Sequence, residues 1–129
     1  MIDETKRRDL RVGFDEDALA YDGTRPVCPA QLVDDLVSLA GLAAGDQIAE
    51  IGPGTGQATV PLAERGMLVT AVEIGAELAL VARRNLARFP GCEILATSFE
   101  EWQPPDGDQG RLGAVVACNS LHWIDPEVR

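Results

Sequence analysis

The chain has 129 residues, of which 46% are hydrophobic and 25% are charged, so its length suits one domain and its composition a globular fold. Its 11 basic and 21 acidic residues give a formal net charge of −10, which repels polyanions, so we expect no nucleic-acid partner. No apolar run has the form of a signal peptide or the length of a membrane span, so we expect a cytoplasmic protein without membrane contact.

Cysteine and histidine counts exclude two kinds of site. The three cysteines, Cys28, Cys92 and Cys118, are odd in number and far apart, so they form neither a disulfide framework nor a CxxC motif. We interpret them as small buried hydrophobic residues in a reducing compartment. The single histidine, His122, excludes a histidine-rich metal site by count, and we expect no metal.

The predicted elements alternate between helices and strands. An amphipathic helix is expected from Pro29 to near Leu42, because apolar residues recur there at helical spacing. The elements expected after it are a strand at 47–52, a helical stretch ending at Arg65 and closed by Gly66, a strand at 67–73, a helix at 76–88, a strand at 92–96 and a fourth strand within 112–119. This alternation predicts an α/β fold with an open, mainly parallel sheet and helices on both faces.

We assign the whole chain, 1–129, to a single domain, because it contains no repeat and no low-complexity tract. Residues 1–44 form a leader and the first helix, and residues 45–129 form the βα units. Within the βα units, a glycine-rich loop follows the first strand and an acid ends the second, so these two positions carry the functional argument.

The glycine-rich loop contains Gly52, Pro53, Gly54 and Gly56, and Glu50 precedes it at the end of the strand. Glycines at a strand-to-helix turn let the backbone approach a ligand closely, and the helix start offers unpaired amides. The dinucleotide fingerprint GxGxxG fails because Gln57 occupies its third glycine position.

Glu73 ends the second strand. An acid at this position in such folds accepts hydrogen bonds from both hydroxyls of a ribose, and the alternative is a solvated carboxylate at a strand end. The two features together therefore indicate a nucleotide-type site.

Glu50 to Gly56 followed by Val72-Glu73 resembles the first two motifs of the class I S-adenosylmethionine-dependent methyltransferases. The similarity covers nearly the whole chain, because 14–36, 97–102 and 119–126 resemble the leader and the later motifs of the small-molecule, type 11 or 12, branch. The resemblance implies a Rossmann-like sheet with strand order 3-2-1-4 and S-adenosyl-L-methionine as the cofactor. Where the family opens its fourth strand with an aromatic residue and an aspartate, this chain has Leu112-Gly113.

The resemblance also implies roles for single residues. By it, Glu50 and the loop of Gly52, Pro53, Gly54 and Gly56 hold the methionine moiety, Glu73 holds the ribose, Ser98 and Phe99 meet the adenine, and Asn119, which opens a later motif, belongs to the cofactor site. The alternative for Phe99 is a packing pair with Trp102. Arg25 and Tyr21 either close over the cofactor or lie in a leader docked on the surface.

The catalytic residues stay unassigned. His122 is able to act as a base near neutral pH, but a lone histidine beside Trp123 is more often a packed loop residue. The predicted activity is methyl transfer to a small-molecule acceptor. The alternatives are a cofactor-binding fragment without turnover and a nicotinamide-dependent oxidoreductase, which Gln57 disfavours.

The C-terminal residues add two expectations. Asp125-Pro126-Glu127 is typical of a helix start, and the resemblance implies seven strands where four are encoded, so we expect a chain truncated after the fourth strand. The fourth strand would then be an unprotected edge, so we expect a homo-oligomer joined at or near residues 114–118.

Overall fold

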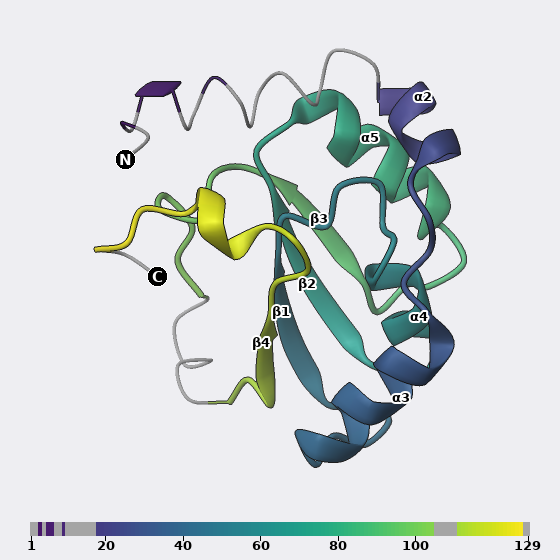
Figure 1. The fold of residues 1–129 in the computed structure, drawn as a ribbon. Helices are drawn as coiled ribbons and strands as arrows, with labels where there is room; N and C mark the ends of the chain where they lie inside the picture. Colours follow the sequence, from purple (N-terminus) through teal and green to yellow (C-terminus); the bar gives the residue numbers. More distant parts are fainter. Residues whose placement is uncertain (1–2, 4, 7–8, 10–17, 105–110, 128–129) are drawn as a thin grey trace.

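The structure is a computed structural model that describes residues 3, 5–6, 9, 18–104 and 111–127. Phe14, the start of the predicted leader motif, lies outside the described residues. The described elements are α2 (Ala18–Thr24), α3 (Ala30–Leu39), β1 (Gln47–Ile51), α4 (Thr59–Glu64), β2 (Leu68–Glu73), α5 (Ala76–Asn85), β3 (Glu93–Ala96), β4 (Ala114–Val116) and the 3₁₀ helix η1 (Leu121–Trp123), and Figure 1 shows their arrangement. None of these helices is long and apolar enough to cross a membrane.

The four strands form one parallel sheet in the order β3-β2-β1-β4, which confirms the predicted order. β1 lies between β2 and β4, with Ala49 opposite Thr70 on one side and Val115 on the other. Because all strands run the same way, their carboxyl ends meet at one edge of the sheet, at the top of Figure 1.

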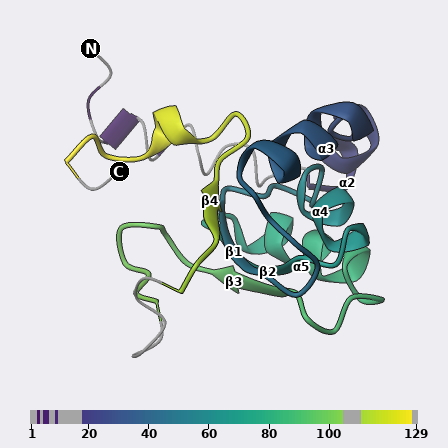
Figure 2. The same cartoon turned by 90° about the horizontal axis from the view of Figure 1, so that it is seen from below.

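The helices α3, α4 and α5 lie on one side of the sheet (Figure 2). The side chains that they cover come from the same face of all four strands, because paired residues of parallel strands point the same way, and include Ile48, Val69, Ala71, Ile94 and Val116. On the opposite side, Figure 2 shows residues 97–104 and η1, so the described part of the chain carries its α-helical layer on one face rather than on both.

Glycines end two of the predicted helices. Gly41 has φ 65°, and the amide of Leu42 donates to the carbonyl of Val37, so the helix predicted to reach Leu42 stops at Leu39. Gly66 ends α4 with φ 84° in the same way, as predicted. Both ends follow the Schellman pattern, in which glycine adopts the left-handed conformation that other residues avoid.

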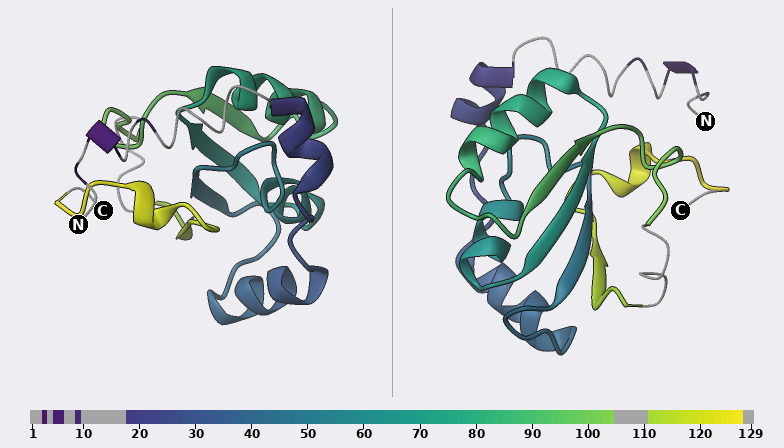
Figure 3. Two further views of the ribbon diagram at one scale, coloured as in Figure 1. Left: turned by 45° about the horizontal axis from the view of Figure 1, so that its top comes forward. Right: turned by 180° about the vertical axis from the view of Figure 1, so that it is seen from behind.

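The described part of the leader lies beside α5 and the glycine-rich loop before the chain enters α3. α2 packs against α5, where Ala18 forms a small apolar cluster with Leu78 and Val81 (Figure 3). From Thr24 the chain runs to Pro29 without regular structure, and the Cys28 amide donates to the Gln57 carbonyl at 3.1 Å. The leader is therefore fastened both to a helix and to the glycine-rich loop.

Candidate functional site

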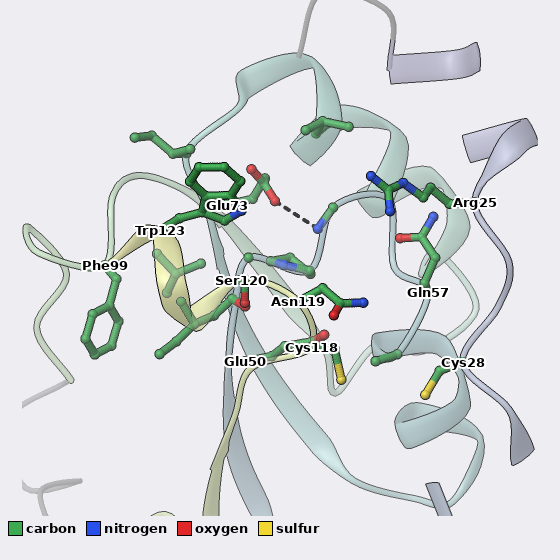
Figure 4. Close-up of a pocket in the computed structure, with 18 of the residues that line it drawn as sticks. Arg25, Cys28, Glu50, Gln57, Glu73, Phe99, Cys118, Asn119, Ser120 and Trp123 are labelled. Atoms are coloured by element: carbon green, nitrogen blue, oxygen red, sulfur yellow. Dashed lines mark hydrogen bonds between the residues drawn. The ribbon is translucent and has the colours of Figure 1, made fainter. Parts of the chain in front are cut away.

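A cavity of about 670 Å³ opens at the carboxyl edge of the sheet. Its walls come from the leader, the ends of β1 and β2, and the segments that follow the strands (Figure 4). Two carboxyl groups, Glu50 and Glu73, line it, and Arg25 and His122 are the basic residues among the described lining. The cavity volume lies in the range that small-molecule and cofactor sites occupy.

Glu50 ends β1 as a buried carboxyl group, with its residue only 1% exposed. The hydroxyl of Thr59 in α4 donates to its Oε2 at 2.6 Å. Burial raises the pKa of Glu50 to about 7; the Thr59 hydrogen bond opposes this shift, and the charge of Glu73 adds to it. The site therefore holds a carboxyl group that is poised between its neutral and charged forms near pH 7.

Glu73 ends β2 and fastens the glycine-rich loop. Its Oε2 accepts a hydrogen bond from the Gly54 amide at 2.8 Å, and its Oε1 accepts one from the Gly75 amide at 3.0 Å. Each carboxylate oxygen has two lone pairs and is able to accept more than one hydrogen bond. A buried carboxylate with both oxygens oriented in this way is suited to accept from two neighbouring hydroxyls.

The glycine-rich loop requires glycine at specific positions. Gly52, Gly54 and Gly56 have φ values of 64°, 60° and 103°, in the region that favours glycine. A Cβ on Gly52 would lie 2.6 Å from the Cβ of Ser120, so the loop and the segment after β4 are in direct contact there. The Ser120 hydroxyl donates to the carbonyl of Ile51, which joins the two segments a second time.

The segment after β4 supplies one wall of the cavity. Asn119 has φ 56°, an uncommon value for a residue other than glycine, and it lines the cavity together with Cys118 and Ser120. The Asn119 turn brings Ser120 back onto β1, so β4 and β1 end at the same wall of the cavity.

Aromatic side chains form another wall. Phe99, His122 and Trp123 line the cavity, and Figure 4 shows Trp123 beside Glu73. The rings of His122 and Trp123 lie 4.5 Å apart, and those of Phe99 and Trp102 lie 6.1 Å apart, so Phe99 both lines the cavity and meets Trp102.

Seven of the nine predicted cofactor residues line this one cavity: Glu50, Gly52, Pro53, Gly54, Glu73, Phe99 and Asn119. Gly56 instead lines a smaller cavity of about 240 Å³ behind the loop. Ser98 is absent from the lining of both cavities, since its hydroxyl accepts from the Glu101 amide, and Thr97 lines the larger cavity in its place.

Several further residues line the cavity although the sequence did not predict them there. Cys28 and Cys118 both line the cavity, from the leader and from the end of β4, and burial raises the pKa of Cys118 to about 11. Figure 4 shows both thiols on the same side of the cavity. Sequence reasoning treated them as core residues because it could not bring two such distant segments together. Within the described residues, no cluster of three or more metal-binding side chains occurs.

Comparison with protein families identifies one matching model, described as a methyltransferase domain, over residues 48–129. An uncharacterized methyltransferase of Mycobacterium tuberculosis is 33% identical over 120 residues, which cover 93% of this chain and 45% of that protein. Ribosomal RNA small subunit methyltransferases also match, among them that of Alkaliphilus oremlandii, 38% identical over 64 residues, with 50% of this chain and 22% of that protein covered.

Two solved structures show the same fold. One, from Methanococcus maripaludis, is described as "a putative s-adenosyl-l-methionine-dependent methyltransferase"; it has a TM-score of 0.65 at 14% identity, with 98% of this chain and 54% of that chain covered. Another, from Anabaena variabilis, is described as a "Putative methyltransferase from antibiotic biosynthesis pathway" and has a TM-score of 0.65 at 28% identity, with 77% and 37% covered. The chain spans about half the length of the relatives that match most of it.

Proposed function

The chain belongs to the S-adenosylmethionine-dependent methyltransferases, and we propose that its cavity binds this cofactor and that the protein transfers the cofactor's methyl group to a small-molecule acceptor. The observation that carries the proposal is the pair of buried carboxyl groups, Glu50 and Glu73, which flank the glycine-rich loop at the ends of neighbouring strands. The carboxyl group of Glu73 suits a diol, and that of Glu50 suits a cation.

Glu73 would hold the ribose. Its two oxygens are already oriented by the amides of Gly54 and Gly75, so the ribose hydroxyls would meet an ordered acceptor. Because the same carboxylate accepts from the Gly54 amide, Glu73 would hold both the loop and the ribose. Phe99 from the segment after β3 would cover the adenine, since an aromatic side chain offers a flat apolar surface to a purine.

The methionine end of the cofactor carries an ammonium group and a carboxylate. Glu50 would attract the ammonium, and Gly52, Pro53 and Gly54 would let the backbone approach the chain between sulfur and amino group. Asn119 would complete the wall opposite the loop. Arg25, a basic residue of the leader that lines both cavities, has the charge that suits the carboxylate.

The bound cofactor supplies a methyl group on a positively charged sulfur. Methyl transfer by direct displacement then requires alignment of the acceptor atom with that carbon, which positioning alone accelerates strongly. The described residues would therefore act by binding, by orientation and by excluding water. His122 lies on the cavity wall, and no catalytic role is assigned to it.

A small-molecule acceptor is favoured over nucleic acid by charge. The net charge of −10 opposes binding to a polyanion, and the Anabaena structure is described as belonging to an antibiotic pathway. The ribosomal RNA methyltransferases among the relatives make RNA the competing acceptor. Transfer of labelled methyl groups from S-adenosylmethionine to a small-molecule extract, compared with transfer to ribosomal RNA, distinguishes the two.

Calorimetric titration of this chain tests the cofactor assignment. We expect S-adenosylhomocysteine, the demethylated product, to bind with one site per chain and NADH to give no heat of binding. The same pair of ligands in a thermal melt should show stabilisation by S-adenosylhomocysteine alone. Stabilisation by NADH alone would favour the oxidoreductase alternative and overturn the proposal.

A further inference from the structure

The side chain of Asn85 joins two segments that are distant in sequence. Its Nδ2 donates to the carbonyl of Thr55 at 2.9 Å and to Oδ1 of Asp22 at 3.0 Å. A primary amide carries two hydrogens on its nitrogen, so each acceptor receives one of them. Asn85 therefore uses its whole donor capacity on two contacts with other segments.

Asn85 makes these contacts from the end of a well-packed helix. It is the last residue of α5, and this helix buries Leu78, Ala79, Val81 and Ala82 and packs against β2 and β3. The two acceptors lie in other elements, since Thr55 belongs to the glycine-rich loop and Asp22 to the short helix α2. Asn85 thus connects a packed helix to the loop and to the leader.

Both acceptors lie next to residues of the proposed cofactor site. Thr55 stands between Gly54, which Glu73 holds, and Gly56, and Asp22 precedes Arg25 by three residues. The smaller cavity, lined by Asp22, Arg25, Thr55 and Asn85 among others, adjoins the larger one, because Arg25, Val27 and Gln57 line both. The Asn85 amide therefore lies directly behind the cofactor cavity.

Asn85 acts beside other contacts of α2 and of the loop, among them the Ala18 cluster and the Cys28 amide bond to Gln57. Arg84 also reaches Asp22, at 3.4 Å, but both side chains are partly exposed, and such pairs contribute little. Glu73 fastens the loop on its other side, at Gly54. The Asn85 bond to Thr55 joins the second half of the loop to α5.

We propose that Asn85 is a positioning residue for cofactor binding: one amide hydrogen orders the glycine-rich loop, and the other holds α2, and with it Arg25, beside the cavity. The inference rests on the proposed function, because the cavity is assigned there to S-adenosylmethionine. Whether Asn85 orders the glycine-rich loop and α2 in the ligand-free chain does not depend on that assignment. Amide hydrogen exchange therefore tests it separately.

Three variants separate the two contacts. Asn85→Asp removes both donors and places a carboxylate against Asp22 and the Thr55 carbonyl. Asp22→Ala removes the contact with the leader alone. The exchanged pair Asp22→Asn with Asn85→Asp restores one donor and one acceptor between α2 and α5 but leaves Thr55 without its donor. Leu80→Ala, on the same helix with a 54% exposed side chain, is the matched control.

Amide hydrogen exchange of the ligand-free variants gives the first measurement. Asn85→Asp should speed exchange in residues 18–28 and 52–58, Asp22→Ala in 18–28 alone, and the exchanged pair in 52–58 alone. Leu80→Ala should match the wild type in both segments. Unchanged exchange in Asn85→Asp would overturn the inference, whatever ligand the cavity takes.

Calorimetric titration with S-adenosylhomocysteine gives the second measurement. Asn85→Asp should weaken binding about tenfold or more, and the exchanged pair should recover only part of this loss. A lower melting temperature with unchanged affinity would show a purely structural role and overturn the positioning role. Failure of the wild type to bind S-adenosylhomocysteine would overturn the proposed function, and the exchange data would still decide whether Asn85 orders both segments.

Discussion

The Glu73 carboxylate accepts a hydrogen bond from the Gly54 amide at 2.8 Å, so the acid that ends β2 fixes the loop that follows β1. A second carboxylate oxygen accepts from Gly75 at 3.0 Å, which holds the side chain toward the loop. The two motifs, 19 residues apart in the sequence, are thus one hydrogen-bonded unit. Such a preformed site saves ordering cost when a ligand binds.

Replacement of Glu73 tests this unit. Glu73→Ala should weaken binding of S-adenosylhomocysteine by about 1.5 to 3 kcal/mol, roughly ten- to over a hundredfold, the range for hydrogen bonds to charged groups. Calorimetric titration measures the loss. Glu93→Ala, an exposed acid on β3, is the control and should bind like the wild type. An unchanged dissociation constant in Glu73→Ala would exclude the ribose role.

A methyl group at Gly52 tests the close contact between the loop and the segment after β4. Gly52→Ala should both destabilise the chain and weaken ligand binding, because φ is 64° and the new Cβ would lie 2.6 Å from the Cβ of Ser120. Gly41→Ala is the matched control, since its φ is 65° and nothing lies within 4 Å of its Cβ. That control should lose only about 1 to 2 kcal/mol. Urea unfolding measures both, and equal losses would show that the contact is unimportant.

The family resemblance predicted the strand order, and the positions of glycines and acids at strand ends predicted most of the cavity lining. Glycines and acids at strand ends have fixed positions relative to the sheet, so Glu50, Gly54 and Glu73 could be placed from the alternation of elements alone. Helix ends could also be predicted where the residue type dictates the backbone conformation, as Gly66 shows at the end of α4.

Side-chain direction in loops could not be predicted. Ser98 follows β3 as expected, but its hydroxyl accepts from the Glu101 amide within the same turn, and Thr97 lines the cavity instead. A hydroxyl with a local backbone partner competes with any ligand, and sequence spacing does not show which one it will choose. The Asn85 contacts join segments 30 and 63 residues apart, and no local pattern predicts them.

Two lysine variants test the predicted association through β4. β4 pairs with β1, its outward Val115 is 59% exposed, and Val116 is buried in the core at 5%. If a second copy pairs with this strand, Val115→Lys should shift sedimentation toward monomer without unfolding the chain. Leu39→Lys adds the same charge at an 89% exposed position on α3 and should leave association unchanged. A wild type that stays monomeric at high micromolar concentration would contradict the prediction.

The raised pKa of Glu50 gives a prediction for stability against pH. Burial raises this pKa from 4.5 to about 7 in the folded chain, so the folded state binds a proton more tightly than the unfolded state does. The stabilisation is fully present below pH 4.5, decreases as the unfolded state ionises, and is lost once pH rises past about 7. Relative to Glu50→Gln, which keeps an acceptor for the Thr59 hydroxyl and does not titrate, the wild type should lose about 2 to 3 kcal/mol between pH 5 and 8. Urea unfolding of both proteins at several pH values gives this difference directly. A difference that stays constant across this range would mean that Glu50 is ionised throughout, and that the charge needed to attract an ammonium group is present without any proton release on binding.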